Sequence, residues 1–459
     1  MNMIKKTLAL ICAVAMMLTM CSCGEEKSND GSNSGEDVTI TFSCWETGTG
    51  KEVITQAISR FEDQNPNIHV EIMFIPAEYQ IKMTAMSVSD TLPDIGYFPE
   101  NSVLVWAQNG KLMDLSSMFE ESPLKDKLEM CKFTDKDGKV VAASVANEIA
   151  LLFYNKDLFD AAGLAYPPAD VADAWTWDEF LTAAKKLTKD RSGNSGDSAE
   201  FNSSRIATYG VNLYQNNLIF ETLMWSNGGG IVDYETEEIL LDKPETIEVL
   251  QAIQDLIYVH HVSPTPTMQG TLPTIVSSLS SGTVAMCIDM QNNVMLLDQA
   301  AKDEGLNYGI GVLPKFKESV SVNGGSPIVI FESTEHPQEC KKLFTFLMDP
   351  ANMTPLLNNG LWMPNETKWY TEEEYINQWL DEDVHVEEYK SAVIDYTLSG
   401  GVRQNSYFYY PYTSHLLGAA WPAIDQVYRN SALPKDAVEK VLQNLRDTIE
   451  FVHSPDFEM

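Results

Sequence analysis

Three short strings have spacings that could support phosphate or metal chemistry, and each lacks a required residue. Residues 48–52 read Gly-Thr-Gly-Lys-Glu, but a phosphate-binding loop needs an earlier glycine, and a Ser or Thr where Glu52 stands. Residues 135–138 resemble part of a calcium loop, yet Phe133 occupies its first ligand position. Residues 260–261 are two histidines with no further His or Cys at metal-ligand spacing, and no Gly-x-Ser-x-Gly string occurs. The sequence therefore predicts no catalytic residue, no metal site and no cofactor.

Residues suited to binding follow segments that have the patterns of strands and helices. Residues 38–44 alternate in polarity, residues 51–64 carry apolar side chains at helical spacing, and residues 69–75 repeat the strand pattern. Strand, helix and strand with short links predict a parallel sheet covered by helices. Residues 176–179 form a capping box that opens a further helix. The architecture is therefore predicted to be α/β, and 459 residues predict about two to four packing units.

Composition restricts the class of partner. Acidic residues outnumber basic ones by 66 to 31, which gives a formal net charge of −35. So negative a surface disfavours nucleic acids and anionic lipid head groups, both of which attract Lys and Arg. The sequence thus predicts a neutral or cationic small-molecule ligand and, because like charges repel, a monomer. The four cysteines beyond residue 23 are widely spaced, which predicts buried free thiols and leaves disulfide formation open.

The first residues read as a targeting signal. Lys5 and Lys6 precede an apolar run over residues 7–20, which is too short for a transmembrane helix. The run ends in Cys-Ser-Cys-Gly, which resembles a bacterial lipobox and predicts a lipid on Cys23, with Cys21 and plain secretion as alternatives. Residues 1–22 are therefore predicted to be a signal peptide, and the polar residues 23–37 a flexible tether. The predicted location is extracytoplasmic and lipid-anchored at the cell membrane.

Longer strings resemble a known family. Residues 92–95 (Leu-Pro-Asp-Ile), 106–115, 153–159, 176–180 and 308–314 resemble, in order, segments of the family 1 extracellular solute-binding proteins. This resemblance implies a receptor that delivers a carbohydrate, in particular an oligosaccharide, to the permease of an ATP-binding-cassette importer.

The resemblance also implies a fold. It is the two-lobed periplasmic-binding-protein fold of type II, in which crossing segments act as a hinge and the ligand lies between the lobes. By position, the N-terminal lobe would be residues 38–149 and 310–356, and the C-terminal lobe residues 150–309 and 357–459. Crossings are expected near residues 145–151, 307–314 and 356–364.

A sugar in such a site needs aromatic rings against its C–H faces and amides or carboxylates around its hydroxyls. The sequence places residues of these types at element ends and at the expected crossings. The candidates are Trp45, Glu46, Thr47, Tyr79, Tyr97, Glu100, Asn147, Glu148, Trp225, Asp289, Gln291, Gly325, Trp362, Arg403 and Tyr407.

Several interpretations stay open at this point. Trp225 could mark a helix end that needs glycine, and the aromatic run after Arg403 could form a lobe or permease contact. The same fold could receive a glycerophosphodiester, a polyamine or a peptide. A secreted glycosidase would need two carboxylates about 5–10 Å apart, and with 66 acidic residues the sequence alone does not exclude such a pair.

Overall fold

The computed structural model describes residues 37–454 and 457. The predicted signal peptide, the predicted lipidation site Cys23 and all but the last residue of the predicted tether lie outside these residues. The described residues from Val38 onward form one compact unit. None of the described helices is long and apolar enough to span a bilayer.

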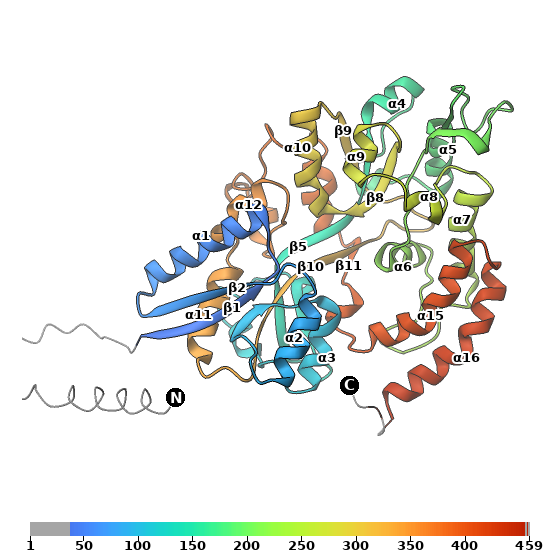
Figure 1. Cartoon of the computed structure of the whole chain (residues 1–459). Helices are drawn as coiled ribbons and strands as arrows, with labels where there is room; N and C mark the ends of the chain where they lie inside the picture. The colour runs from blue at the N-terminus through green and yellow to red at the C-terminus, as the bar shows by residue number, and fades with distance from the viewer. Residues whose placement is uncertain (1–36, 455–456, 458–459) are drawn as a thin grey trace, which may run out of the picture. The chain divides into compact units, whose positions relative to one another are not determined.

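A nine-stranded mixed sheet forms the centre of this unit (Figure 1). Its main path runs β2, β1, β3, β10, β5, β4, with β11 beside β10, and β8 and β9 beside β5. β1 pairs in parallel with both β2 and β3, whereas β10 is antiparallel to β3 and β5. The predicted first strand is confirmed over its full length, and the second begins one residue earlier than predicted. The strands are β1 (Val38–Cys44), β2 (Ile68–Phe74), β3 (Ile95–Tyr97), β4 (Lys132–Thr134), β5 (Val140–Asn155), β8 (Met286–Met290), β9 (Tyr308–Gly311), β10 (Ser321–Ile330) and β11 (Val402–Arg403).

β5 is the strand that links the two parts of the sheet. Residues 140–149 pair with β4 and β10, whereas residues 150–155 pair with β8 and β9. The crossing predicted at 145–151 therefore lies inside one continuous strand. The second crossing differs from its predicted place, because residues 308–311 form β9 and pair with the far end of β5. It is β10 that runs beside the centre of β5 and on to β3.

The helices surround this sheet (Figure 1). Gly48 begins the helix that was predicted from residue 51, and the capping box of Thr176 and Glu179 is present. Proline occupies the first turn of α7, α11 and α16, where its missing N–H costs nothing. The longer helices are α1 (Gly48–Gln64), α2 (Tyr79–Val88), α3 (Glu100–Gln108), α5 (Trp177–Leu187), α6 (Asn217–Ser226), α7 (Pro244–Tyr258), α10 (Val294–Glu304), α11 (Pro337–Met348), α15 (Thr413–Tyr428) and α16 (Pro434–Val452).

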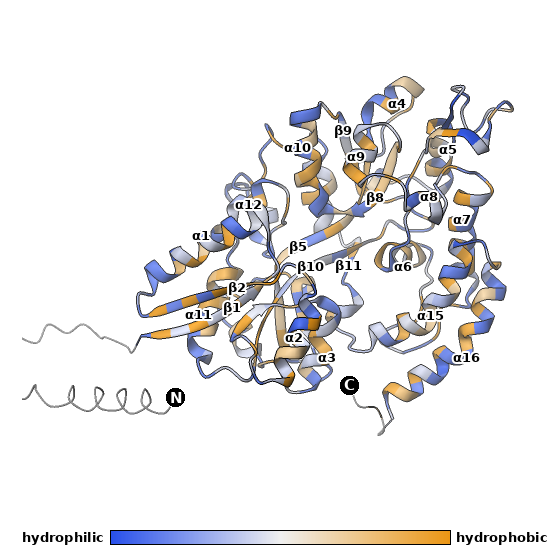
Figure 2. Cartoon of the chain, viewed as in Figure 1, coloured by the Kyte–Doolittle hydropathy of each residue, from blue (hydrophilic) through white to orange (hydrophobic). Residues whose placement is uncertain are grey.

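Both faces of β5 are buried, which explains its nearly continuous apolar sequence. Because side chains alternate along a strand, Ile149, Leu151 and Phe153 pack into one hydrophobic cluster, whereas Ala150 and Leu152 pack into another. The apolar stripe of α16 packs toward the second cluster and its polar side faces outward (Figure 2). All four described cysteines are buried free thiols, as the sequence predicted.

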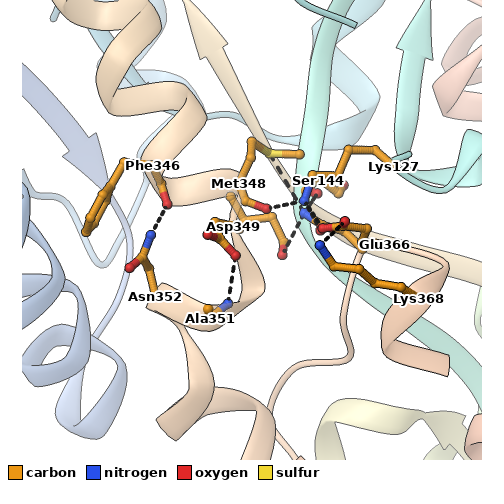
Figure 3. Close-up of polar contacts among 11 residues, drawn as sticks. Lys127, Ser144, Phe346, Met348, Asp349, Ala351, Asn352, Glu366 and Lys368 are labelled. Carbon is orange, nitrogen blue, oxygen red and sulfur yellow. Dashed lines mark hydrogen bonds and ion pairs between the residues drawn. The ribbon is translucent and has the colours of Figure 1, made fainter. Parts of the chain in front are cut away.

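A buried ion pair fastens the chain just after the third predicted crossing (Figure 3). The Lys127 ammonium lies 2.9 Å from Glu366, whose other oxygen lies 2.7 Å from Lys368. The Lys127 and Glu366 side chains are 1% and 5% exposed. Asn365 accepts a hydrogen bond from Lys127 and donates to the carbonyl of Ser144, so the network joins this segment to β5.

Candidate functional site

The carboxyl ends of β1 and β3 lie at one edge of the sheet, because the two strands are parallel. β1 leads directly into Trp45 and Glu46, and β3 is followed after two residues by Glu100. The centre of β5 supplies Glu148, which stands opposite Gly324 of β10. Element ends that are far apart in the sequence therefore lie around β5, the strand that links the two parts of the sheet.

Four predicted aromatic residues form one group. The Trp45 ring lies 5.2 Å from that of Tyr79 and 5.0 Å from that of Tyr97, measured between centroids. Trp362, from the third predicted crossing, lies 6.4 Å from Tyr97. Tyr79, Tyr97 and Trp362 are buried, whereas Trp45 keeps part of its surface exposed. In this conformation Trp45 is therefore the ring available to a ligand, and the other three support it.

Glu100 connects three segments. Its Oε1 accepts a hydrogen bond of 2.6 Å from the Gly325 backbone N–H, and its Oε2 accepts one of 3.2 Å from Asn405 Nδ2. Burial raises the pKa of this carboxyl from 4.5 to about 8, although the bond from Gly325 lowers it. Asn405 was missed by the sequence reasoning, since its position beside the aromatic run gave no sign of a partner on α3.

Glu148 is a carboxyl group without a partner. Among the described residues it makes no hydrogen bond and no ion pair, and the same holds for the Glu46 carboxyl. Burial raises its pKa from 4.5 to about 8, and the negative charges of Glu100, Asp289 and Glu46 raise it further. Gly324, which lies opposite Glu148, has no side chain. A Cβ atom at this position would lie 3.1 Å from Met290 Cε and 3.7 Å from Glu100 Oε1. The space facing Glu148 is therefore bordered by a carboxylate and a flexible thioether.

Asp289 at the end of β8 completes the acidic group. It accepts hydrogen bonds from the Tyr214 hydroxyl at 2.6 Å and from the Met290 N–H at 2.8 Å. Burial raises its pKa, while the bond from Tyr214 lowers it. Burial alone raises the pKa of Glu46 to about 6. Tyr214 was not predicted, although its place in a polar string just before α6 is a signal that could have found it. We call Trp45, Glu46, Glu100, Glu148 and Asp289 the central site.

Other predicted residues lie around the central site in supporting positions. The Asn147 backbone pairs with Met363, and the buried Asn147 amide has no partner in the described part of the chain. Gln291 is buried and donates to the Gly360 carbonyl. Thr47 is exposed at the start of α1. Tyr407 is half-buried, and its pKa is raised by burial and, to a smaller extent, by the charges of Glu221 and Glu100.

Trp225 and Arg403 line a separate hollow of about 650 Å³. The Arg403 guanidinium lies 5.8 Å from the centroid of the Trp225 ring, and Tyr234 and Tyr409 form further walls. Trp225 is also the penultimate residue of α6, and Gly228, two residues beyond the end of this helix, has a φ of +80°, the left-handed conformation that glycine favours. The sequence placed Trp225 and Trp45 in one site, whereas the structure places Trp225 beside Arg403 and Trp45 beside Tyr79.

No group of three or more His, Cys, Asp or Glu side chains among residues 37–454 is arranged to hold a metal ion. The carboxyls of the central site lack cationic neighbours within ion-pair distance in the described structure. The arrangement therefore offers hydrogen-bond acceptors and one partly exposed ring, which suits a ligand with several donor groups and an apolar face.

Comparisons with known proteins agree with this arrangement. The family described as bacterial extracellular solute-binding protein matches residues 56–381. An arabinooligosaccharide-binding protein of Halalkalibacterium halodurans is 26% identical over 52% of this chain, and the match spans only half of that relative's length. A galactooligosaccharide-binding protein of Bacillus subtilis is 22% identical over 77% of this chain and 78% of its own.

The fold agrees with that of solved structures. A Listeria monocytogenes substrate-binding protein in complex with cycloalternan superposes with a TM-score of 0.72, over 91% of this chain and 100% of its own, at 21% identity. The predicted two-lobed, α/β solute-binding fold is thereby confirmed.

Proposed function

Because the chain belongs to the bacterial extracellular solute-binding protein family, we propose that it captures a carbohydrate outside the cytoplasm. We expect the ligand to be an oligosaccharide and the recipient to be the permease of an ATP-binding-cassette importer. The receptor acts as a monomer and is held at the cell membrane by a lipid on Cys23. The names of the oligosaccharide-binding relatives support the ligand class.

The observation that carries the proposal is the position of Trp45 beside the carboxyls of the central site. A partly exposed indole can stack on the apolar face of a sugar ring, contributing about 0.5–1.5 kcal/mol beyond burial. Carboxyl oxygens of Glu46, Glu100, Glu148 and Asp289 can accept hydrogen bonds from its hydroxyls. Glu148 makes no hydrogen bond within the described residues, so it is free to do so without breaking an existing contact.

The lobes supply the conformational change. We assign residues 38–149 and 323–356 to one lobe and residues 150–322 and 357–459 to the other, with β5 and β10 as links between them. β5 passes from one lobe to the other at Glu148, so a bend there would close both lobes on a ligand held by this residue. Closure would bury the sugar and create the surface that the permease recognises.

The ligand is expected to leave the protein chemically unchanged. A phosphodiester ligand is disfavoured because no lysine or arginine pairs with the described carboxyls of the central site. A glycosidase would need one carboxyl to donate a proton and another to attack the sugar or activate water. The raised pKa of Glu100 and Glu148 alone does not assign those roles, since their burial explains it.

A thermal-shift screen tests the proposal. The purified mature protein is heated with arabino-, galacto- and malto-oligosaccharides and their monomers, and the sugar is then recovered and analysed. The proposal expects at least one saccharide to raise the melting temperature and to be recovered intact. Consumption of the saccharide would instead indicate an enzyme, and absence of any shift would contradict a carbohydrate receptor.

A further inference from the structure

The hollow beside Arg403, which we call the Trp225 hollow, combines aromatic rings with unbonded polar groups. Its volume of about 650 Å³ lies within the range of about 300–1,000 Å³ that small-molecule sites occupy. Trp225, Tyr234 and Tyr409 form its aromatic walls, and none of its described lining residues belongs to the central site. A ligand in the Trp225 hollow would therefore contact a different set of residues from a ligand at Trp45.

One short segment contributes to both places. Arg403 belongs to β11, which pairs with β10, and its guanidinium lies 5.8 Å from the centroid of the Trp225 ring. Two residues later, Asn405 donates its hydrogen bond to Glu100 of the central site. Neighbouring residues of this segment are thus directed to the Trp225 hollow and to the central site.

The aromatic walls are held in place by contacts within the protein. The Tyr234 hydroxyl donates a hydrogen bond of 2.7 Å to Glu221. The Tyr234 and Tyr409 rings meet edge to face, with centroids 6.3 Å apart and planes at 89°. Gly228 and Gly229 also line the hollow and add no side chain to it. Walls that are already ordered lose little conformational entropy when a ligand binds.

The donors at the Trp225 hollow have unused capacity. The Trp225 residue is 6% exposed, yet its indole N–H makes no hydrogen bond within the described residues. The Tyr409 hydroxyl is likewise unbonded in the described part of the chain. Arg403 lies 3.8 Å from Glu318, which is beyond hydrogen-bond distance. A nearly buried N–H without a partner is unfavourable, and a ligand in the hollow would supply the partner.

Acceptors line the same hollow. Asp233 Oδ1 accepts hydrogen bonds from two backbone N–H groups of the following turn, at 3.0 and 2.8 Å, whereas its Oδ2 has no partner among the described residues. The Gln404 amide donates to the carbonyls of Glu129 and Lys132, so its oxygen remains an acceptor. Free donors and free acceptors beside aromatic rings are what a sugar with several hydroxyls requires.

Opposite charges balance at this place. Burial raises the pKa of Tyr409 to about 12, the charges of Glu221, Glu235 and Asp233 raise it further, and the charge of Arg403 lowers it. Arg403, Asp233 and Glu235 all line the hollow. Neither an anion nor a cation would meet only opposite charges there, so a neutral ligand fits best.

We propose that the Trp225 hollow is a second carbohydrate-binding site and takes a neutral sugar unit. The sugar would lay its C–H face on the Tyr409 ring, which is the less buried of the aromatic walls. Its hydroxyls would accept from the Trp225 N–H and the Arg403 guanidinium and would donate to Asp233. This inference rests on the proposed function for the ligand class and adds a site that is independent of Trp45.

Fluorine NMR of the mature protein labelled with fluorinated tryptophan tests each site separately. The chain has nine tryptophans, and the signals of Trp45 and Trp225 are those missing from Trp45→Phe and Trp225→Phe. Maltotriose, galactobiose and arabinobiose are the neutral probes, and glucuronate and glucosamine are the charged ones. A neutral probe is expected to shift both signals saturably, with a weaker dissociation constant at Trp225 than at Trp45.

Variants assign the second response to the hollow. In Trp45→Ala, the Trp225 signal should still shift with an unchanged dissociation constant. Tyr409→Ala should weaken binding at Trp225 at least about tenfold and Arg403→Gln at least about fivefold, while the Trp45 signal responds as in the wild type. Arg446→Gln removes an exposed charge on α16 and is the matched control. Melting temperatures show that each variant is folded.

The outcomes separate the two proposals. A Trp225 signal that no saccharide moves, while the Trp45 signal shifts, would overturn the second site and leave the carbohydrate receptor intact. Loss of the Trp225 shift in Trp45→Ala, or an unchanged shift in both Tyr409→Ala and Arg403→Gln, would also overturn it. Tighter binding of glucuronate or glucosamine than of the neutral probes at Trp225 would overturn the choice of a neutral sugar. No response of either signal, with no hit in the thermal-shift screen, would overturn both proposals.

Discussion

Two groups of carboxyls in this protein, one buried around Glu366 and one half-buried around Glu148, have opposite surroundings. Glu366 lies between Lys127 and Lys368, at 2.9 and 2.7 Å, and the network ties the chain to β5. Glu148 lies in β5 itself, but its described neighbours include three further carboxyls and no cation. The first group is complete without a ligand and holds the fold together. The second group has no cationic partner among the described residues, as expected for side chains that form their polar contacts with a ligand.

The largest expected effect is on stability. Lys127→Ala would leave Glu366 buried with only the more exposed Lys368, and removing one partner of a buried pair costs about 3–5 kcal/mol. Glu148→Gln, in contrast, should leave the free energy of unfolding unchanged or raise it. Denaturant titration of both variants measures the difference. A Glu148 variant that is destabilised as strongly as the Lys127 variant would remove the distinction between the two groups.

The next effect is on affinity. Trp45→Ala should weaken binding of the saccharide at least about tenfold, or roughly 1.4 kcal/mol, because the exposed stacking face is lost. Trp225→Ala is the matched comparison, since it lines the hollow beside Arg403. Calorimetric titration of both proteins locates the ligand. A larger loss for Trp225→Ala would transfer the site to that hollow.

A smaller effect is expected on the pH dependence of the free energy of unfolding. Folding raises the pKa of Glu148 from 4.5 to about 8, so the folded state binds its proton more tightly than the unfolded state. Its stabilising contribution is full below about pH 4.5 and is lost as the pH rises through about 8. The free energy of unfolding should thus fall over this window by at least about 1 kcal/mol, the equivalent of one pKa unit. Glu148→Gln should flatten the curve, and an unchanged slope would contradict burial as the cause.

The smallest effect is expected for a surface pair. Arg429 and Asp425 are one helical turn apart, and their side chains are 57% and 37% exposed. Such pairs contribute about 0.3–0.5 kcal/mol. Arg429→Ala should therefore lower the free energy of unfolding by no more than about this amount, far less than Lys127→Ala. If Arg429→Ala and Lys127→Ala lowered the free energy of unfolding by similar amounts, burial would not determine how much these ion pairs contribute to stability.

Much of the fold could be predicted from local patterns. The alternation of residues 38–44, the spacing in α1 and the capping box at Thr176 each depend on neighbouring residues, and the structure confirms them. The second crossing was predicted near β9, whereas β10 is the strand that pairs with the centre of β5, and only the pairing distinguishes the two. That pairing is a long-range property that no local pattern contains.

The candidate site likewise contains residues that the sequence could identify and residues that it could not. Trp45, Glu100 and Glu148 could be selected because element ends and crossings are visible in the sequence. Asn405 could not be linked to Glu100, since 305 residues separate them. Trp225 was grouped with Trp45 because composition shows which residues can stack on a sugar and not which hollow they line. The missing counter-charges became visible only when the neighbours of each carboxyl were known.

The central claim is that the unpaired carboxyls beside Trp45 hold the ligand. Titration of the wild type and of Glu148→Leu with a saccharide that raises the melting temperature tests it most directly. Leucine removes both the charge and the hydrogen-bond acceptor at similar size. We predict at least about tenfold weaker binding with the free energy of unfolding preserved. Equal affinity in the two folded proteins would contradict the claim.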